Sequence, residues 1–246
     1  MTIKKLKIGS QPTDSTCGPT CLKAIYDYYD YAIELERIIT EIPFLETGGT
    51  LEVFLGTHAL DHGFKARMYT FNLDVFDPTW FFPKPLDPKQ LIDKLHLVIQ
   101  AKKNRKIDIA CLAYIEFLEK GGKIRMQDLS MNIILRYLKK GIPILTGLSS
   151  TYLYKCSREY VKEGKQHRND ISGHPEGHFV VLESYDTETK IVTLMDPWPE
   201  NPYSKFLHYS LSRDHLLTAI MLGIFTYDAN LMIITKNSNS EDTTLF

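Results

Sequence analysis

Residues 11–22 read QPTDSTCGPTCL, and this stretch is the most informative part of the sequence. Cys17 stands where an extended segment turns into a helix, because the apolar residues after it recur at helical spacing. The triplet DST just before Cys17 consists of residue types that cap helix N-termini. Pro19 fits the first helical turn, where a missing N–H costs little. The stretch therefore predicts a helix that begins at Cys17.

A cysteine at the start of a helix is suited to nucleophilic chemistry. The positive end of the helix dipole lies beside the sulfur and favours the thiolate, which is the reactive form. The backbone N–H of Cys17 can point at the oxyanion that forms on an attacked carbonyl. The side-chain amide of Gln11, six residues upstream, can supply a second donor. Cys17 is thus a candidate nucleophile and Gln11 a candidate oxyanion donor.

A thiol nucleophile also needs a base, and the base needs an acceptor that orients it. The runs HFVVLESY and KIVTLMD predict the two strands of a β-hairpin. A three-residue loop would pair Tyr185 with Thr189 and place His178 opposite Asp196, at a Cβ distance of about 4.5 to 5.5 Å. A carboxylate that close can hold one imidazole tautomer. A two- or four-residue loop would place Pro197 opposite His178 instead.

The other patterns mix helices and strands, and two segments look irregular. Helical spacing predicts helices at residues 33–41, 50–63, 89–103, 108–120, 131–140 and 212–222. Apolar, β-rich runs predict strands at residues 65–72, 142–154 and 231–236. Residues 73–88 read as a loop pinned by aromatic side chains, and residues 155–177 as a long mobile loop of the kind found over binding sites.

Composition narrows the class of protein. The length of 246 residues and the hydrophobic content of 43% fit one elaborated domain, expected over residues 1–236 with a disordered polar tail at 237–246. A formal charge of −1 gives no reason to expect nucleic acid as a partner. We find no signal sequence, and no segment reaches the roughly 18 apolar residues of a membrane span. Four cysteines in a chain of this length do not indicate a disulfide framework, so we expect reduced thiols and a cytoplasmic protein.

The segments QPTDSTCGPTCL, KKGIPIL, GHFVVLESYD and MDPW together resemble the papain-like cysteine peptidase superfamily. They are most similar to the bacteriocin-processing peptidases, which cut leader peptides after a double glycine. The resemblance implies an α+β papain-like fold, in which a helical part led by the nucleophile helix packs on an antiparallel β-sheet, with a helical insertion at about 73–130. It also implies Cys17 as nucleophile, His178 as general base and acid, Asp196 as orienting residue and Gln11 as oxyanion donor.

The resemblance implies a peptide or protein substrate and no cofactor or metal. The expected reaction is amide hydrolysis through a thioester. Two other functions stay open: transfer of the acyl group to an amine or thiol, and peptide binding without catalysis. The substrate, the choice between endopeptidase, terminal peptidase and amidase, and the oligomeric state do not follow from the sequence.

Four further residues have simpler interpretations. Cys21 lies one helical turn after Cys17 and is expected in the core. His58 and His62 are spaced for one metal, but no Glu follows His58 as in zinc peptidases, so a solvated helix face is favoured. Trp198, close to Asp196 in sequence, is expected to shield the catalytic residues from water.

Overall fold

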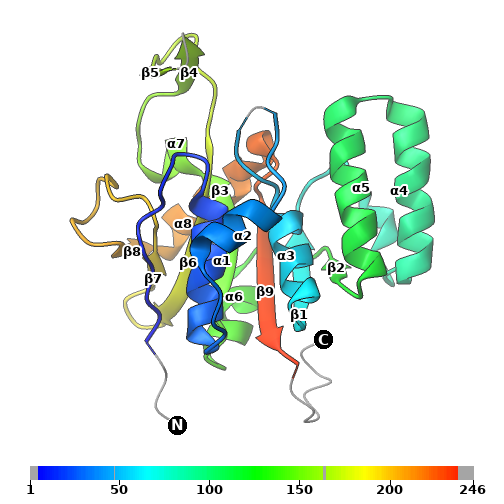
Figure 1. Cartoon of the computed structure of the whole chain (residues 1–246), viewed down its shortest axis with the longest axis horizontal. Helices are drawn as coiled ribbons and strands as arrows, with labels where there is room; N and C mark the ends of the chain where they lie inside the picture. Colours follow the sequence, from blue (N-terminus) through cyan, green and yellow to red (C-terminus); the bar gives the residue numbers. More distant parts are fainter. Residues whose placement is uncertain (1–4, 47, 163–164, 238–246) are drawn as a thin grey trace.

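Apolar runs from distant parts of the chain meet in one seven-stranded sheet. The computed structural model describes residues 5–46, 48–162 and 165–237. The strand order is β2-β1-β9-β3-β6-β7-β8, and within the described residues only β1 and β2 pair in parallel (Figure 1). The strands are β1 Phe64–Thr70, β2 Lys123–Arg125, β3 Ile144–Ser149, β6 Gly177–Asp186, β7 Ile191–Met195, β8 His208–Ser212 and β9 Asn230–Lys236.

Helices cover both faces of this sheet. They are α1 Cys17–Tyr28, α2 Leu35–Glu41, α3 Glu52–Asp61, α4 Pro88–Lys102, α5 Arg105–Glu119, α6 Met131–Leu138, α7 Ser150–Leu153 and α8 Arg213–Leu222, with short 3₁₀ helices at Pro78–Trp80 and Gly223–Thr226. Alternate residues of β6 enter two cores, because side chains alternate across a strand. Phe179 and Val181 pack with α1, α3 and α5, whereas Val180 and Leu182 pack with α6 and α8. Both faces of β6 are therefore buried.

The prediction of an α+β papain-like arrangement is confirmed, and the predicted helices lie within a few residues of the observed ones. Two predictions are wrong. Residues 142–154 are not one strand, because the chain turns into α7 after β3, where the hydroxyl of Ser149 accepts a hydrogen bond from the N–H of Tyr152 at 3.4 Å. Residues 155–177 are not an irregular loop, since they contain the hairpin of β4 Glu159–Lys162 and β5 Lys165–Arg168.

The segment between β1 and β2 forms a helical hairpin of α4 and α5 beside the edge of the sheet (Figure 1). The aromatic residues of the preceding loop are packed as predicted except for Phe82, which is 50% exposed: the ring of Phe76 contacts those of Trp80, Phe81 and Tyr114 at centroid distances of 6.3, 5.9 and 4.7 Å. The division into one domain with an insertion at about 73–130 stays a prediction. Residues 238–246 of the predicted tail lie outside the described residues.

The described chain contains no helix that is long and apolar enough to span a bilayer. The solvated face predicted for His58 and His62 is wrong. Only 6% of His58 and 13% of the His62 side chain are exposed, because both face α1 and α2 rather than solvent. Their spacing of four residues was visible in the sequence, but the helices that cover them were not.

Candidate active site

Cys17 is the first residue of α1, as predicted. The residue before it, Thr16, holds the N-cap position without a capping hydrogen bond from its side chain. Its hydroxyl instead donates to the carbonyl of Thr13 at 2.9 Å, so the capping role predicted for this triplet is wrong. The first N–H groups of a helix have no partner within the helix. The uncapped start of α1 therefore leaves donors and the positive end of the helix dipole beside Cys17.

A glycine brings the start of α1 close to β6. A Cβ on Gly18 would lie 2.9 Å from Thr50 and 3.2 Å from Phe179, so only a residue without a side chain fits at this approach. One turn further, the thiol of Cys21 donates to the carbonyl of Phe179 at 3.2 Å and is fully buried, which confirms its place in the core. Close packing against Phe179 places Cys17 next to the preceding residue of β6, His178.

The predicted register of the hairpin is wrong. Asp186 pairs with Ile191, so the loop consists of residues 187–190 and is one residue longer than predicted. This turn displaces the pairing by three residues from the predicted one, and a bulge between Leu182 and Ser184 takes one residue of that displacement back. Loop length and bulge together displace β7 by two residues relative to the predicted pairing.

This double shift leaves Asp196 on the same face as His178. Val181 pairs with Met195, so the next residue, Asp196, is level with Val180. Side chains in a strand alternate between faces, and a displacement of two residues therefore restores the predicted face. Asp196 becomes a diagonal neighbour of His178, within reach of a long side chain. Without the bulge, Asp196 would be level with Val181 and would point into the opposite core.

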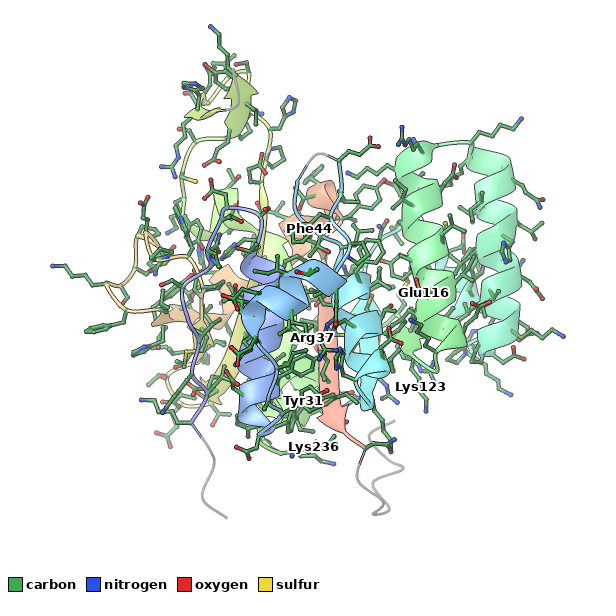
Figure 2. The ribbon with its side chains drawn as sticks, in the orientation of Figure 1. Tyr31, Arg37, Phe44, Glu116, Lys123 and Lys236 are labelled. Atoms are coloured by element: carbon green, nitrogen blue, oxygen red, sulfur yellow. The ribbon has the colours of Figure 1, made fainter. Side chains whose placement is uncertain are left out.

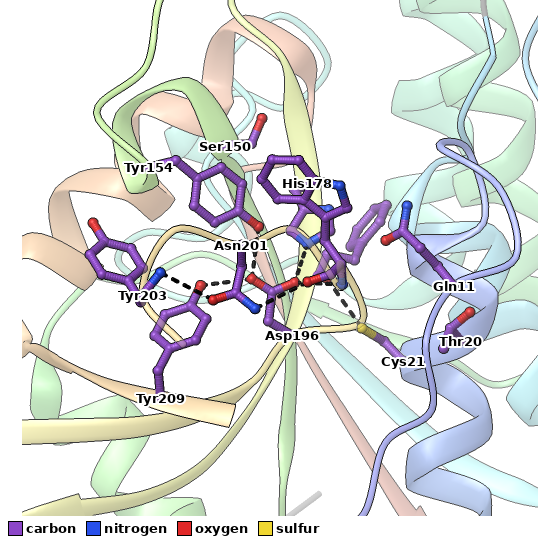
Figure 3. A network of polar contacts seen from close by, with 12 residues as sticks. Gln11, Thr20, Cys21, Ser150, Tyr154, His178, Asp196, Asn201, Tyr203 and Tyr209 are labelled. Carbon is purple, nitrogen blue, oxygen red and sulfur yellow. Dashed lines mark hydrogen bonds and ion pairs between the residues drawn. The ribbon is translucent and has the colours of Figure 1, made fainter. Parts of the chain in front are cut away.

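The carboxylate of Asp196 is completely buried and has four hydrogen-bond donors (Figure 3). Its Oδ1 lies 2.8 Å from Nε2 of His178 and accepts from the N–H of Trp198 at 2.9 Å. Its Oδ2 accepts from the hydroxyls of Tyr154 and Tyr209, both at 2.7 Å. Burial raises the pKa of Asp196, but the charge and hydrogen bond of His178 outweigh it and hold the pKa below its usual value. Asp196 is therefore ionised.

His178 lies between Asp196 and Cys17. Burial lowers the pKa of His178, but the charge of Asp196, the charge of Cys17 and hydrogen bonds with both residues raise it to about 10. Since Nε2 contacts Asp196, Nδ1 is the ring nitrogen that remains for Cys17. A protonated imidazole beside a cysteine is the arrangement that favours a thiolate.

Gln11 lies on the segment that precedes α1. Its backbone N–H donates to the carbonyl of Pro197 at 2.9 Å, which ties this segment to the chain just after Asp196. Its side-chain Nε2 donates to the carbonyl of Thr13 at 2.9 Å. An amide nitrogen has two N–H groups, so one further donor remains. Gln11 lies in the same cleft as His178, and its role as oxyanion donor stays a prediction.

The cleft has a volume of about 440 Å³ and lies between the segment before α1, which contains Gln11 and Asp14, and the β4–β5 hairpin. Its walls include Gln11, His178, Tyr154, Trp198, Glu159 and Arg168. The rings of Tyr154 and Trp198 pack at a centroid distance of 4.8 Å on the side of Asp196. Trp198 thus packs on the ring whose hydroxyl binds Asp196, and its shielding role stays a prediction. The segment predicted as a loop over the site supplies one wall of the cleft.

Sequence reasoning missed two residues of this site, Tyr154 and Tyr209. Tyr154 follows α7 and Tyr209 lies in β8, so neither is near Asp196 in sequence. The one available signal was the alternation of β8, which turns Tyr209 and Leu211 inward. A buried tyrosine hydroxyl needs a polar partner, but that rule does not say which.

One family model matches part of the chain. Residues 113–214 match the family model described as the Peptidase_C39 like family, a span that includes His178 and Asp196 but not Cys17. No curated protein matches the chain significantly.

Solved structures that are similar to the chain include three described as peptidases or proteases. A C39-like peptidase from Bacillus anthracis has 13% identity, coverage of 96% of both chains and a TM-score of 0.51. A double glycine motif protease from an AMS/PCAT transporter, in complex with its leader peptide, has 12% identity, coverage of 95% of this chain and 93% of its own, and a TM-score of 0.45. Xylellain, a cysteine protease from Xylella fastidiosa, has 14% identity, coverage of 96% and 84%, and a TM-score of 0.44. The chain thus resembles the C39-like peptidases and has the α+β fold of papain-like cysteine peptidases.

Proposed function

We propose that the protein is a cysteine peptidase that hydrolyses amide bonds of peptides through a thioester on Cys17. The observation that carries the proposal is the contact of Nε2 of His178 with the buried carboxylate of Asp196 at 2.8 Å, next to Cys17, whose charge raises the pKa of His178. This order of thiol, imidazole and carboxylate is the one that nucleophilic catalysis requires. The papain-like fold and the C39-like family match support the same reaction class.

In the acylation step, the thiolate of Cys17 attacks the carbonyl carbon of the scissile amide, and the carbonyl oxygen becomes an oxyanion. His178 then donates its Nδ1 proton to the leaving nitrogen, the C–N bond breaks, and a thioester remains on Cys17. Asp196 stays ionised and holds the imidazole through Nε2. The oxyanion is stabilised by the N–H of Cys17 at the start of α1 and by the remaining N–H of Gln11.

In the deacylation step, the now neutral imidazole of His178 takes a proton from a water molecule. The resulting hydroxide attacks the thioester carbon, the C–S bond breaks, and the carboxylic acid product leaves. The thiolate and the imidazolium are then restored. No group other than water is needed to balance the reaction.

The charge of the cleft bears on the substrate. Four carboxylates line it, those of Asp14, Glu159, Glu176 and Glu200, and Glu159 pairs with Arg168 at 3.2 Å. Like charges in a cleft attract ligands of the opposite sign. We therefore propose peptides with Lys or Arg near the scissile bond as preferred substrates.

The experiment is cleavage of a fluorogenic peptide library by the full chain and by Cys17→Ala, with product masses determined by mass spectrometry. We expect the Cys17→Ala variant to lose turnover. We also expect the unchanged chain to cleave peptides with Lys or Arg near the scissile bond faster than other peptides. Cys111→Ser is the matched control, because Cys111 is buried in α5, away from the cleft. Full turnover by Cys17→Ala would contradict the proposal.

The same assay, repeated with a peptide amine as acceptor, separates hydrolysis from acyl transfer. We expect free acid as the main product. A transpeptidation product in excess of free acid would identify a transferase, and peptide binding without any product would identify a binding module.

A further inference from the structure

A second cluster of ligating side chains lies at the other end of α1. It consists of Glu41 at the end of α2, His58 in α3 and His62 just after α3. Oε2 of Glu41 lies 3.0 Å from Nε2 of His58 and 3.1 Å from Nε2 of His62, and these three atoms all lie within 4.8 Å of one another. The two imidazole rings stack at a centroid distance of 4.3 Å. Both Nε2 atoms therefore point at one small volume beside the carboxylate.

The opposite nitrogen of each imidazole is also held. The hydroxyl of Tyr26 lies 2.7 Å from Nδ1 of His58, and the hydroxyl of Tyr31 lies 2.8 Å from Nδ1 of His62. Histidines that bind a metal almost always have such a partner on the second nitrogen, which fixes the tautomer and the ring orientation. Each histidine of this cluster has one.

The third side chain is oriented in the same way. Arg37 donates from Nε to Oε1 of Glu41 at 2.7 Å, which leaves Oε2 directed at the histidines. A cavity of about 430 Å³ borders the cluster and is lined by Arg37, Glu41, His58, His62 and, from α5, Glu116. Figure 2 shows Tyr31 and Arg37 on the side of the molecule where α1 and α2 lie, and Glu116 on α5. A ligand can thus reach the cluster from the cavity.

We propose that Glu41, His58 and His62 bind a divalent transition-metal ion of the zinc type. Two histidines and one glutamate are a known ligand set for zinc, with a fourth position left for water. Bonds of about 2.0 to 2.2 Å in a tetrahedron separate neighbouring ligand atoms by about 3.3 to 3.6 Å. The two Glu41 to histidine distances are close to that separation, and the ligand atoms of the two histidines lie within 4.8 Å of each other.

Binding requires a proton to move within each histidine. Without metal, Nε2–H of His58 and of His62 donates to Glu41, and the tyrosine hydroxyls donate to Nδ1. With metal, Nε2 becomes a ligand, Nδ1 carries the proton, and each tyrosine oxygen accepts it. The tyrosines thus have a hydrogen-bond role in both states.

This site is distinct from the candidate active site. Tyr26 follows Cys17 by nine residues in the same helix, which corresponds to about 13 Å along the axis. The metal would link α2 to α3 beside the C-terminal end of α1. Its expected effect is on the stability of this helical layer.

The test is metal binding by the untagged full chain carrying Cys17→Ala. This substitution removes the thiol next to His178 in the candidate active site. The chain is treated with a chelator, dialysed and titrated with ZnCl₂ by calorimetry, and the melting temperature is measured with and without the metal. CoCl₂ serves as a spectroscopic probe. We expect one equivalent of Zn²⁺, a rise in melting temperature, and a cobalt spectrum of nitrogen and oxygen ligands without a thiolate band.

The variants Glu41→Gln and His62→Gln keep the size of partly exposed side chains and should lower zinc affinity at least about 100-fold. Tyr31→Phe should lower it about 10-fold, as expected for loss of an outer hydrogen bond. His96→Gln is the matched control, because His96 is exposed on α4 away from the cluster. Absence of binding to the folded parent chain, or binding that survives both Glu41→Gln and His62→Gln, would overturn the proposal.

Discussion

Replacement of Asp196 by Asn removes one charge from the candidate active site and preserves its shape. The amide oxygen can still accept from His178 and Trp198, which lie 2.8 and 2.9 Å from Oδ1. The amide nitrogen then faces Tyr154 and Tyr209, whose hydroxyls can turn from donating to accepting. The substitution therefore tests the charge of Asp196 and not its hydrogen bonds alone.

The size of the effect follows from the pKa of His178. Burial lowers this pKa, while four influences raise it from 6.5 to about 10, and the charge of Asp196 is the largest of the four. The largest of four must supply more than a quarter of a net rise of about 3.5 pH units. We therefore expect Asp196→Asn to lower the pKa of His178 by at least about 1 pH unit, or about 1.4 kcal/mol.

The sign of the change is fixed by the proton that His178 donates. Acylation needs the imidazolium, so activity should fall as pH rises through the pKa of His178. The alkaline limb of kcat/KM, which reports the free enzyme, should lie near pH 10 and move to lower pH in Asp196→Asn. Asp93→Asn, which removes an exposed carboxylate on α4, should leave the limb in place.

The assay is kcat/KM for one cleaved peptide between about pH 5 and about pH 11, together with an NMR titration of the His178 ring, which needs no substrate. An alkaline limb and a ring titration that stay unchanged in folded Asp196→Asn would refute the reasoning, because the charge of Asp196 would then not set the protonation of His178.

Three further predictions concern residues around the site. Tyr154→Phe and Tyr209→Phe each remove a hydroxyl that donates to a buried carboxylate, so each should lower the free energy of unfolding in urea by about 1.5 to 3 kcal/mol. Equal stability of the double variant and the parent chain would contradict this. Gly18→Ala should cost about 1 to 3 kcal/mol, because its Cβ would lie 2.9 Å from a neighbouring side chain, whereas Gly9→Ala, with open space around it, should cost little. Burial raises the pKa of Asp228 to about 7. The native state therefore holds a proton that the unfolded state loses above the usual pKa of 3.8, and the free energy of unfolding falls as pH rises from 3.8 to 7. Asp228→Asn should stabilise the protein above pH 7, by at most about 4 kcal/mol, and not below about pH 4.

The start of α1 could be predicted because its signals are local. Two signals mark the beginning of the helix: apolar residues at helical spacing after Cys17, and Pro19 in the first turn. They lie within a few residues of one another in the sequence. The contact between His178 and Asp196 was predicted correctly from an incorrect register. The turn length and the bulge were not visible in the sequence, and their two errors cancelled because strand side chains repeat every two residues.

Contacts between distant elements could not be predicted. The hydroxyl of Tyr154, the residue after α7, and that of Tyr209 in β8 both reach Asp196, and no spacing rule relates these positions. The spacing of His58 and His62 was visible, but Glu41 joins them from α2 only once the helices have packed. The sequence therefore indicated which residues carry chemistry more readily than which side chains orient them.

The central claim, that His178 holds the thiol of Cys17 as a reactive thiolate, is tested most directly by the rate of alkylation with iodoacetamide at about pH 6. Cys156→Ser serves as the parent chain, because Cys21 and Cys111 are fully buried, whereas Cys17 is 8% exposed. An ordinary thiol with a pKa of about 8.5 is almost entirely protonated at that pH. We expect alkylation at Cys17, located by mass spectrometry, to be at least about tenfold faster in the parent chain than with His178→Gln added. Equal rates in the two folded proteins would contradict the account.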